Sequence, residues 1–298
     1  MKKSCGIRIT PQKVGQKLLN LLVYLLLTEC VFLFVFPFLF MFVNSLKYEF
    51  DIKDLTKEWL VLRVNPYNYT EAIRQMNYWP NLLKTLGLVT LATLGHLASC
   101  MMVGYGIARF KFAGRQVVFG LAILSIIVPP QLFMIPSYIL YNKLGWTNTI
   151  LPIVVPTYFG FGLKGGLFIF LFRQAFKALP PAYEEAAKIE GCSSLKIFLQ
   201  IILPMVKTTM LVCTMLSFIW HWNDYFEPMM YLKGDNMLLT QLLEKLNNTV
   251  YSMSSGSGVT LNPVSLAGCV LVVSPLLIFY FAVSHWFVQG IELSGLAN

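Results

Sequence analysis

Charged side chains are scarce in this sequence of 298 residues. Only 12% of the residues are charged, whereas 56% are hydrophobic and the mean hydropathy is +0.64. Soluble domains carry about 25% charged residues, so the composition excludes a water-soluble domain with an ordinary polar surface and indicates a membrane protein. The net charge of +9 does not indicate nucleic-acid binding, because the basic residues flank apolar runs instead of forming an aromatic-interleaved polar surface.

Motifs for catalysis, phosphate binding and metal binding are also missing. The sequence contains no G-x-x-x-x-G-K-[ST], no G-x-S-x-G and no H-E-x-x-H, and its three histidines are far apart along the chain. The six cysteines lie in apolar runs or on the expected cytoplasmic side, which leaves no pair for an external disulfide and no spacing for zinc. We therefore expect no catalytic residue, no cofactor and no metal site in this chain.

Long apolar runs take the place of these motifs. Each run has the length that a helix needs to cross a bilayer, and none alternates as a transmembrane strand would. The predicted fold class is therefore an all-α membrane protein, and the first run is too long for a secretory signal peptide. The six expected transmembrane helices cover about 18–43, 81–108, 117–140, 150–172, 204–222 and 263–288.

The positive charges predict the orientation of these six helices. They gather before the first run and in the connections at 109–116 and 173–203, which the positive-inside rule places in the cytoplasm together with both termini. The opposite connection YNKLGWTNT carries only Lys143. The expected organisation is a tail at 1–17, a helix at 18–43, an external loop at 44–80, a core at 81–288 with the cytoplasmic segment 173–203 and the external loop 223–262, and a tail at 289–298.

Prolines, glycines and small residues predict how the helices bend and pack. Pro129, Pro130 and Pro136 should kink the run 117–140, and the prolines and glycines between 152 and 166 should kink the next run. A stripe of small residues on the run 81–108 should allow close contact with another helix. The stripe consists of Ala92, Gly95, Ser99 and, less tightly, Gly106.

The connection at 173–203 is the most informative part of the sequence. Pro181 and the acidic pair Glu184 and Glu185 favour a helix N-terminus, and Gly191 permits a stop. Ser193 is a good N-cap for a second helix that precedes Pro204. The second helix should present an apolar face made of Leu195, Phe198, Leu199 and Ile202. These signals predict a compact, rigid pair of short helices.

At these residues the sequence resembles the integral-membrane permease subunits of ABC importers. Their cytoplasmic signature is E-A-A, three residues, G, nine residues and I-x-L-P. Glu185, Ala186, Ala187 and Gly191 match it here, followed at the same spacing by Ile201-Ile202-Leu203-Pro204. GYGIARFKFAGR at 104–115, WND at 222–224 and the terminal FVQGIELSGLAN extend the resemblance to the carbohydrate branch of this MetI-like family, in the half similar to the maltose-type G subunit.

The resemblance implies a function and a set of partners. The helix pair would be the coupling segment that docks on a cytoplasmic ATPase, with Glu184, Glu185, Ala186, Ala187, Gly191, Leu203 and Pro204 as its coupling residues. The partners would be a second homologous permease, two ATPase subunits that bind ATP and Mg, an external solute-binding protein, a carbohydrate and membrane lipid. The location would be the bacterial cytoplasmic membrane.

Two alternatives for the function stay open at this point. One is a stand-alone secondary transporter or channel, for which Glu29 and Lys164 within apolar runs are the only signals. The other is an ABC permease for a solute that is not a sugar. Glu29 fits a helix–helix contact or a polar site, Lys164 fits snorkelling or a pathway, and Trp222, Asn223 and Asp224 fit an external gate, a binding-protein contact or a helix end.

Overall fold

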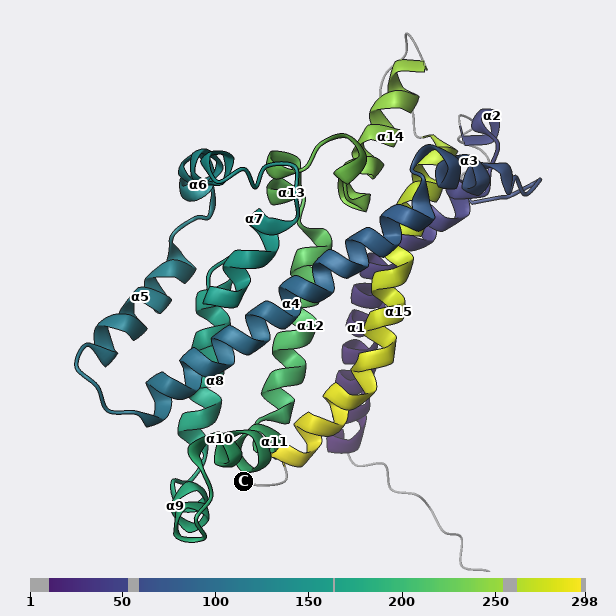
Figure 1. Ribbon diagram of the computed structural model, residues 1–298. Coiled ribbons are helices and arrows are strands. Elements are labelled where there is room, and N and C mark those ends of the chain that lie inside the picture. The colour runs from purple at the N-terminus through teal and green to yellow at the C-terminus, as the bar shows by residue number, and fades with distance from the viewer. Residues whose placement is uncertain (1–10, 53–58, 163, 254–261, 296–298) are drawn as a thin grey trace, which may run out of the picture.

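The computed structural model is a bundle of helices (Figure 1). It describes residues 11–52, 59–162, 164–253 and 262–295, and all regular secondary structure within them is helical, as predicted. Parts of the predicted tails 1–17 and 289–298, and most of the run SMSSGSG at 252–258, lie outside the described residues. The elements are α1 (Pro11–Ser45), α2 (Glu49–Ile52), α3 (Tyr67–Gln75), α4 (Tyr78–Arg109), α5 (Arg115–Ile127), α6 (Gln131–Lys143), α7 (Leu151–Val154), η2 (Val155–Phe159), α8 (Gly165–Ala178), α9 (Ala182–Ile189), α10 (Ser194–Ile197), η3 (Phe198–Ile202), α11 (Leu203–Met205), α12 (Lys207–Asn223), α13 (Phe226–Tyr231), η4 (Gly234–Asn236), α14 (Leu239–Met253) and α15 (Pro263–Gly295).

Helix α4 is the central helix of the bundle. It packs against α8, η2 and α12, and Figure 1 shows it running from the end that carries α3 towards α9 and α10. Two apolar cores lie along it. One, towards α13 and α14, includes Leu88, Trp222 and Leu239, and the other, towards α9, includes Phe172 and Ile197. Two cores on one helix explain why α4 is buried over so much of its length.

The predicted run 117–140 is divided into two helices. α5 ends at Ile127 and α6 begins at Gln131, with an angle of 105° between them. Val128 precedes the proline pair and is extended, at φ −70° and ψ 124°, because a residue before proline is driven out of the helical region. The kink predicted at Pro129 and Pro130 is confirmed, and it is a full break instead of a bend.

The predicted run 150–172 is broken at its glycines. After η2 the chain passes through three residues of positive φ, Gly160 at 71°, Gly162 at 117° and Lys164 at 62°, before α8 begins. Glycine adopts such angles without strain, whereas a helix cannot continue through them. The run is therefore shared by α7, η2 and α8.

The predicted stripe of small residues on α4 is only partly correct. A Cβ at Gly95 would lie 2.1 Å from Oγ1 of Thr157 in η2, so close helix contact is confirmed there. Ser99 donates to the carbonyl of Thr157 at 2.5 Å. The contact expected at Gly106 is wrong, because nothing lies within 4 Å of a Cβ there, and Gly104 makes the close approach, to Phe172 of α8.

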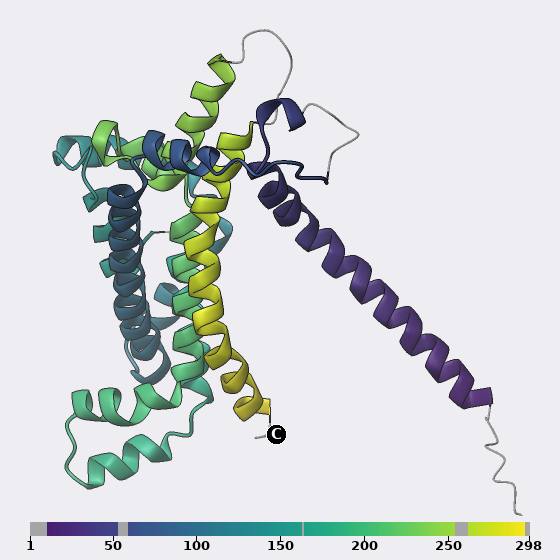
Figure 2. The same cartoon turned by 90° about the vertical axis from the view of Figure 1, so that its right-hand side faces the viewer.

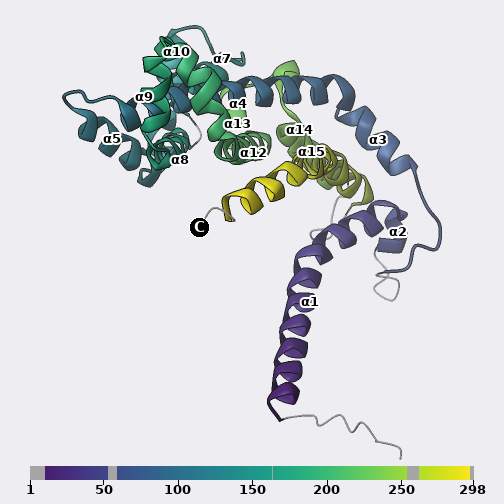
Figure 3. The same ribbon diagram turned by 90° about the horizontal axis from the view of Figure 1, so that it is seen from below.

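Helix α1 stands apart from the other helices over most of its length, as Figures 2 and 3 show. It meets α15, and most of its apolar side chains between Leu19 and Phe42 are exposed. Within the described residues, α1, α4 and α15 are each long and apolar enough to cross a bilayer, and two bent helix pairs bring the number to five if each is one span. The count of six spans stays a prediction.

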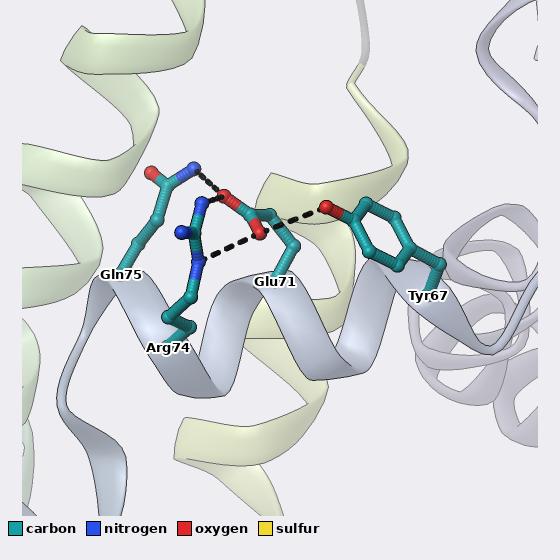
Figure 4. A network of polar contacts seen from close by, with 4 residues as sticks. All are labelled: Tyr67, Glu71, Arg74 and Gln75. Atoms are coloured by element: carbon teal, nitrogen blue, oxygen red, sulfur yellow. Dashed lines mark hydrogen bonds and ion pairs between the residues drawn. The ribbon is translucent and has the colours of Figure 1, made fainter.

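The elements opposite to α9 form a cap of short helices. α2, α3, α13 and α14 gather at this end of the molecule (Figure 1). On α3, Glu71 accepts hydrogen bonds from Arg74 at 2.7 Å, Gln75 at 2.7 Å and Tyr67 at 3.3 Å (Figure 4). Arg74 is the main reason why the pKa of Glu71 lies below its usual value. This network supports a helix of nine residues that packs on α15 and α4.

Candidate functional site

The segment that joins α8 to α12 folds as a helix, a glycine turn and a second helix. The carbonyl of Pro181 accepts the N–H groups of Glu184 and Glu185 at 3.0 and 3.1 Å, which starts α9. Gly191 has a φ of +79°, and its N–H donates to the carbonyl of Lys188 at 3.0 Å. The left-handed conformation closes the helix at little cost because the residue is glycine. The predicted first helix and its end are confirmed.

The second helix begins where the sequence predicts. Oγ of Ser193 accepts the N–H of Lys196 at 3.4 Å, so the predicted N-cap is confirmed. The helix continues through α10, the π-helical turn η3 and α11, and then turns by 79° into α12. This bend separates the segment from the span that follows it.

The predicted apolar face of the second helix is half correct. Phe198 and Ile202 are buried, but Leu195 and Leu199 are 68% and 49% exposed, and Ile197 takes part in the core instead. In η3 the turn widens, so residues five apart, such as 197 and 202, come to the same side. A regular helical period misses this shift.

Helix α9 divides the predicted coupling residues between two faces. Glu185, Ala186 and Gly191 are exposed, whereas Glu184 and Ala187 are only 8% and 4% exposed. Ala187 belongs to the core around α8 and α10, so its small size serves packing within this chain, and its role in docking stays a prediction. Further along, Leu203 is half-buried and Pro204 is exposed.

The buried carboxylate of Glu184 meets a partner that the sequence reading missed. Nε of Arg109, the last residue of α4, lies 2.8 Å from Oε1 of Glu184. The sequence indicates for Arg109 only a role in orienting the helices across the membrane. Its position at the end of an apolar helix could have indicated this contact, because a long basic side chain there can turn back and pair with an acidic group of the protein.

Large apolar side chains cover the exposed side of the segment. Ile189 is 88% exposed at the end of α9, Leu195 is 68% exposed on α10, and Tyr183 and Leu199 are each 49% exposed. Figure 2 shows α9 and α10 projecting beyond the long helices. An apolar surface that projects beyond the spans is typical of a protein–protein contact.

The WND residues at the other end of α12 have mainly structural contacts. Trp222 is 2% exposed, and its Nε1 donates to the carbonyl of Val272 in α15 at 3.2 Å. Oδ1 of Asp224 accepts the N–H of Phe226 at 3.1 Å and so starts α13. Asn223 is exposed. Of the three, Asn223 is the residue placed to meet a partner.

A small cavity lies next to Asp224. It has a volume of about 140 Å³ and is lined by the carboxylates of Asp224 and Glu227 and by Tyr141 and Tyr231, among others. Burial raises the pKa of Asp224 to about 6, and burial followed by the charge of Asp224 raises the pKa of Glu227 to about 8. Carboxyl groups and tyrosine hydroxyls can exchange hydrogen bonds with a polyhydroxylated ligand.

Four other polar residues have defined places. His96 of α4 and His221 of α12 are buried with their ring centres 5.0 Å apart, although the sequence separates them widely. Lys164 is exposed in the break before α8, and Glu29 is exposed on α1. Among the residues that the structure describes, no group of three or more metal-binding side chains is arranged to hold an ion.

Comparison with known protein families identifies the chain. Residues 100–293 match the family described as binding-protein-dependent transport system inner membrane component. The chain belongs to this family. The matched residues run from the last part of α4 to α15 and include the segment between α8 and α12 and the WND residues, whereas α1 lies outside them.

Characterised relatives and one solved structure agree. The permease is 27% identical to the lactose transport system permease protein LacG of Rhizobium radiobacter, over 92% of this chain and 96% of that protein. It is 27% identical to the osmoprotective compounds uptake permease protein GgtD of Synechocystis, over 90% and 89% of the two chains. A bacterial ABC transporter involved in the import of alginate, an acidic polysaccharide, shares the fold with a TM-score of 0.75 at 18% identity, over 92% and 98% of the chains.

Proposed function

We propose that this chain is one permease subunit of an ATP-driven, binding-protein-dependent importer of a carbohydrate in the bacterial cytoplasmic membrane. It would pair with a second, homologous permease. Two ATPase subunits, which bind the ATP and Mg, would sit on the cytoplasmic side, and a solute-binding protein would deliver the sugar from outside. Hydrolysis is then the work of the partners, and this chain supplies half of the pathway.

The exposed apolar side of α9 and α10 carries this proposal. Ile189 and Leu195 project from a rigid pair of helices outside the bundle, which a chain working alone would have no reason to expose. Burying one such side chain contributes about 1.5–3 kcal/mol, so a few of them suffice to hold a partner. A packed helix pair can transmit a displacement of the ATPase to the membrane helices, whereas a flexible connection could not.

The substrate class rests on the relatives. Relatives are named as transporters of lactose, arabinooligosaccharides, starch degradation products and alpha-glucosides, and the solved structure concerns alginate. The cavity beside Asp224, with its carboxyl and tyrosine groups, has suitable chemistry for hydroxyl groups. A permease for a non-sugar solute stays as the second candidate, because other relatives are named for osmoprotective compounds and sn-glycerol-3-phosphate.

The proposed mechanism is alternating access. Closure of the ATPase subunits on ATP would displace α9 and α10, and this would turn the bundle outward to receive sugar from the docked binding protein. Hydrolysis would return it to the inward-facing state. To shift such a gate from 1:99 to 99:1 takes about 5.5 kcal/mol of differential stabilisation, which binding of an ATPase subunit to a rigid segment can supply.

Co-purification tests the proposal directly. The tagged chain is extracted gently from its native membrane, and the proteins that remain bound are identified and quantified. We expect one other permease and two ATPase copies per chain, and ATP-dependent uptake when the complex is placed in liposomes with its binding protein. A pure preparation that transports solute without an ATPase would favour the stand-alone transporter instead.

One substitution and a matched control test the docking face. Ile189→Asp should reduce ATPase retention roughly 30-fold, because about 2 kcal/mol of apolar burial is lost. Leu62→Asp changes a side chain that is 59% exposed in the loop at the opposite end, and it should leave retention unchanged. Uptake of labelled oligosaccharides, compared with sn-glycerol 3-phosphate, decides between the two substrate classes.

A further inference from the structure

Arg109 joins the end of α4 to the coupling segment at two points. Its Nε lies 2.8 Å from Oε1 of Glu184 in the first turn of α9, and the two side chains are only 12% and 10% exposed. Its Nη2 donates to the carbonyl of Leu179 at 2.9 Å, in the linker that leaves α8. One guanidinium therefore holds both α9 and the chain that leads into it.

The ion pair connects α9 to the bundle, and α9 has few other contacts with the bundle. α9 packs mainly on α10 and η3, which follow it in the chain and belong to the same segment. Removal of one partner from a buried ion pair leaves an uncompensated charge and is strongly unfavourable, unlike the loss of an exposed pair. Arg109 and Glu184 therefore resist separation when α9 is pulled away from α4.

Helix α4 extends from this pair to the other end of the molecule. It has 32 residues, or about 48 Å at 1.5 Å per residue. At its far end, Oγ1 of Thr85 accepts the N–H of Leu239 at 3.2 Å, and the hydroxyl of Tyr78 donates to the carbonyl of Leu271 at 2.9 Å. A shift of α4 thus acts on the start of α14 and on α15 without passing through a flexible connection.

We propose that the Arg109–Glu184 ion pair passes the displacement of α9 to α4, and that both are positioning residues for coupling ATP hydrolysis to transport. The proposal rests on the proposed function, because α9 is displaced only if a partner acts on it. A pair that merely holds the fold would affect stability alone. A pair that transmits movement determines how much solute is imported for each ATP hydrolysed.

The ratio of solute imported to ATP hydrolysed tests the proposal. It is measured on the full complex in liposomes with saturating binding protein. Glu184→Gln should keep assembly and ATP hydrolysis but lower the ratio about tenfold, because the neutral amide no longer forms the ion pair with Arg109. The control is Glu190→Gln, an exposed carboxyl at the end of the same helix, which should leave the ratio unchanged.

A covalent link provides a second test that does not depend on the tolerance of one variant. Arg109→Cys and Glu184→Cys are combined in a chain whose Cys5, Cys30 and Cys192 are replaced by serine, and the pair is joined by a short thiol-reactive linker. If the two positions move together, the unlinked variant should be poorly coupled and the linked one should regain most of its coupling. If the contact must open during the cycle, the linker should abolish uptake.

The outcomes distinguish failure of the Arg109–Glu184 link from failure of the proposed importer function. A wild-type complex without ATP-dependent uptake refutes the proposed function and the link together. A working wild type in which Glu184→Gln keeps the full import ratio, or in which the linker stops uptake, refutes the link alone. A lowered ratio with intact hydrolysis, restored by the linker, supports it.

Discussion

The close packing of α4 against η2 makes a quantitative prediction at Gly95. A Cβ there would lie 2.1 Å from Oγ1 of Thr157 and 2.7 Å from the ring of Tyr158. Thr157 cannot easily give way, because it is fully buried and its hydroxyl donates to the carbonyl of Val154 at 2.7 Å. The Gly95→Ala variant must therefore push the two elements apart.

The expected cost follows from two opposing terms. Overpacking costs about 1–3 kcal/mol, and a contact of 2.1 Å with a fixed neighbour belongs at the upper end. Alanine in place of glycine inside a helix recovers about 1 kcal/mol. Gly95→Ala should thus destabilise the chain by about 2 kcal/mol. Gly87→Ala, at an exposed position of the same helix with nothing within 4 Å of the new Cβ, should stabilise it by about 1 kcal/mol.

Unfolding of the detergent-solubilised chain measures this difference of about 3 kcal/mol between the two variants. Gly106→Ala is a second control, since the space around it is also open. A Gly95→Ala variant as stable as Gly87→Ala would refute the reasoning. It would mean that α4 and η2 do not approach as the structure has them.

Three further predictions concern other parts of the chain. Gly191→Pro should uncouple ATP hydrolysis from uptake, because the φ of +79° at this turn is closed to proline, and normal sugar-stimulated hydrolysis with normal uptake would contradict this. Glu227→Gln should flatten the pH dependence of stability, because the raised pKa makes the wild type lose stability as pH rises from 4.5 to about 8, and unchanged pH profiles would count against a raised pKa of this carboxyl. Trp222→Phe should lower the free energy of unfolding by about 1–2 kcal/mol, through loss of the hydrogen bond to Val272, whereas Trp79→Phe, at a position 62% exposed, should have little effect.

Local features of the fold could be predicted because the sequence carries local signals for them. Pro129 and Pro130 act on their own neighbours, and Gly191 and Ser193 end and begin helices by their own backbone and side-chain chemistry. Contacts between distant segments could not be predicted in this way. The approach of His96 to His221 depends on how α4 and α12 are rotated against each other, and no pattern within either helix records that rotation.

The stripe on α4 shows why helical periodicity alone is insufficient. A regular helical period puts Gly106 on the same face as Gly95, eleven residues before it. The chain after α7 is broken at Gly160–Lys164, and α8 therefore meets α4 on another face than η2 does. At about 100° per residue, Gly104 lies about half a turn from Gly95, and it is Gly104 that contacts α8. The break in one helix thus determines which glycines of another must be small.

The same limit applies to the coupling motif. Its spacing identifies the segment, but Glu184 and Ala187, three residues apart, share the face of α9 that turns towards the chain's own core. Glu185 and Ala186 lie on the exposed side. A residue in such a motif can therefore contact a partner protein or pack within its own chain, and the sequence motif does not distinguish the two. The exposed fraction separates them, which is why Glu185→Gln should weaken retention of the ATPase, whereas Glu184→Gln should leave the ATPase bound and impair transmission.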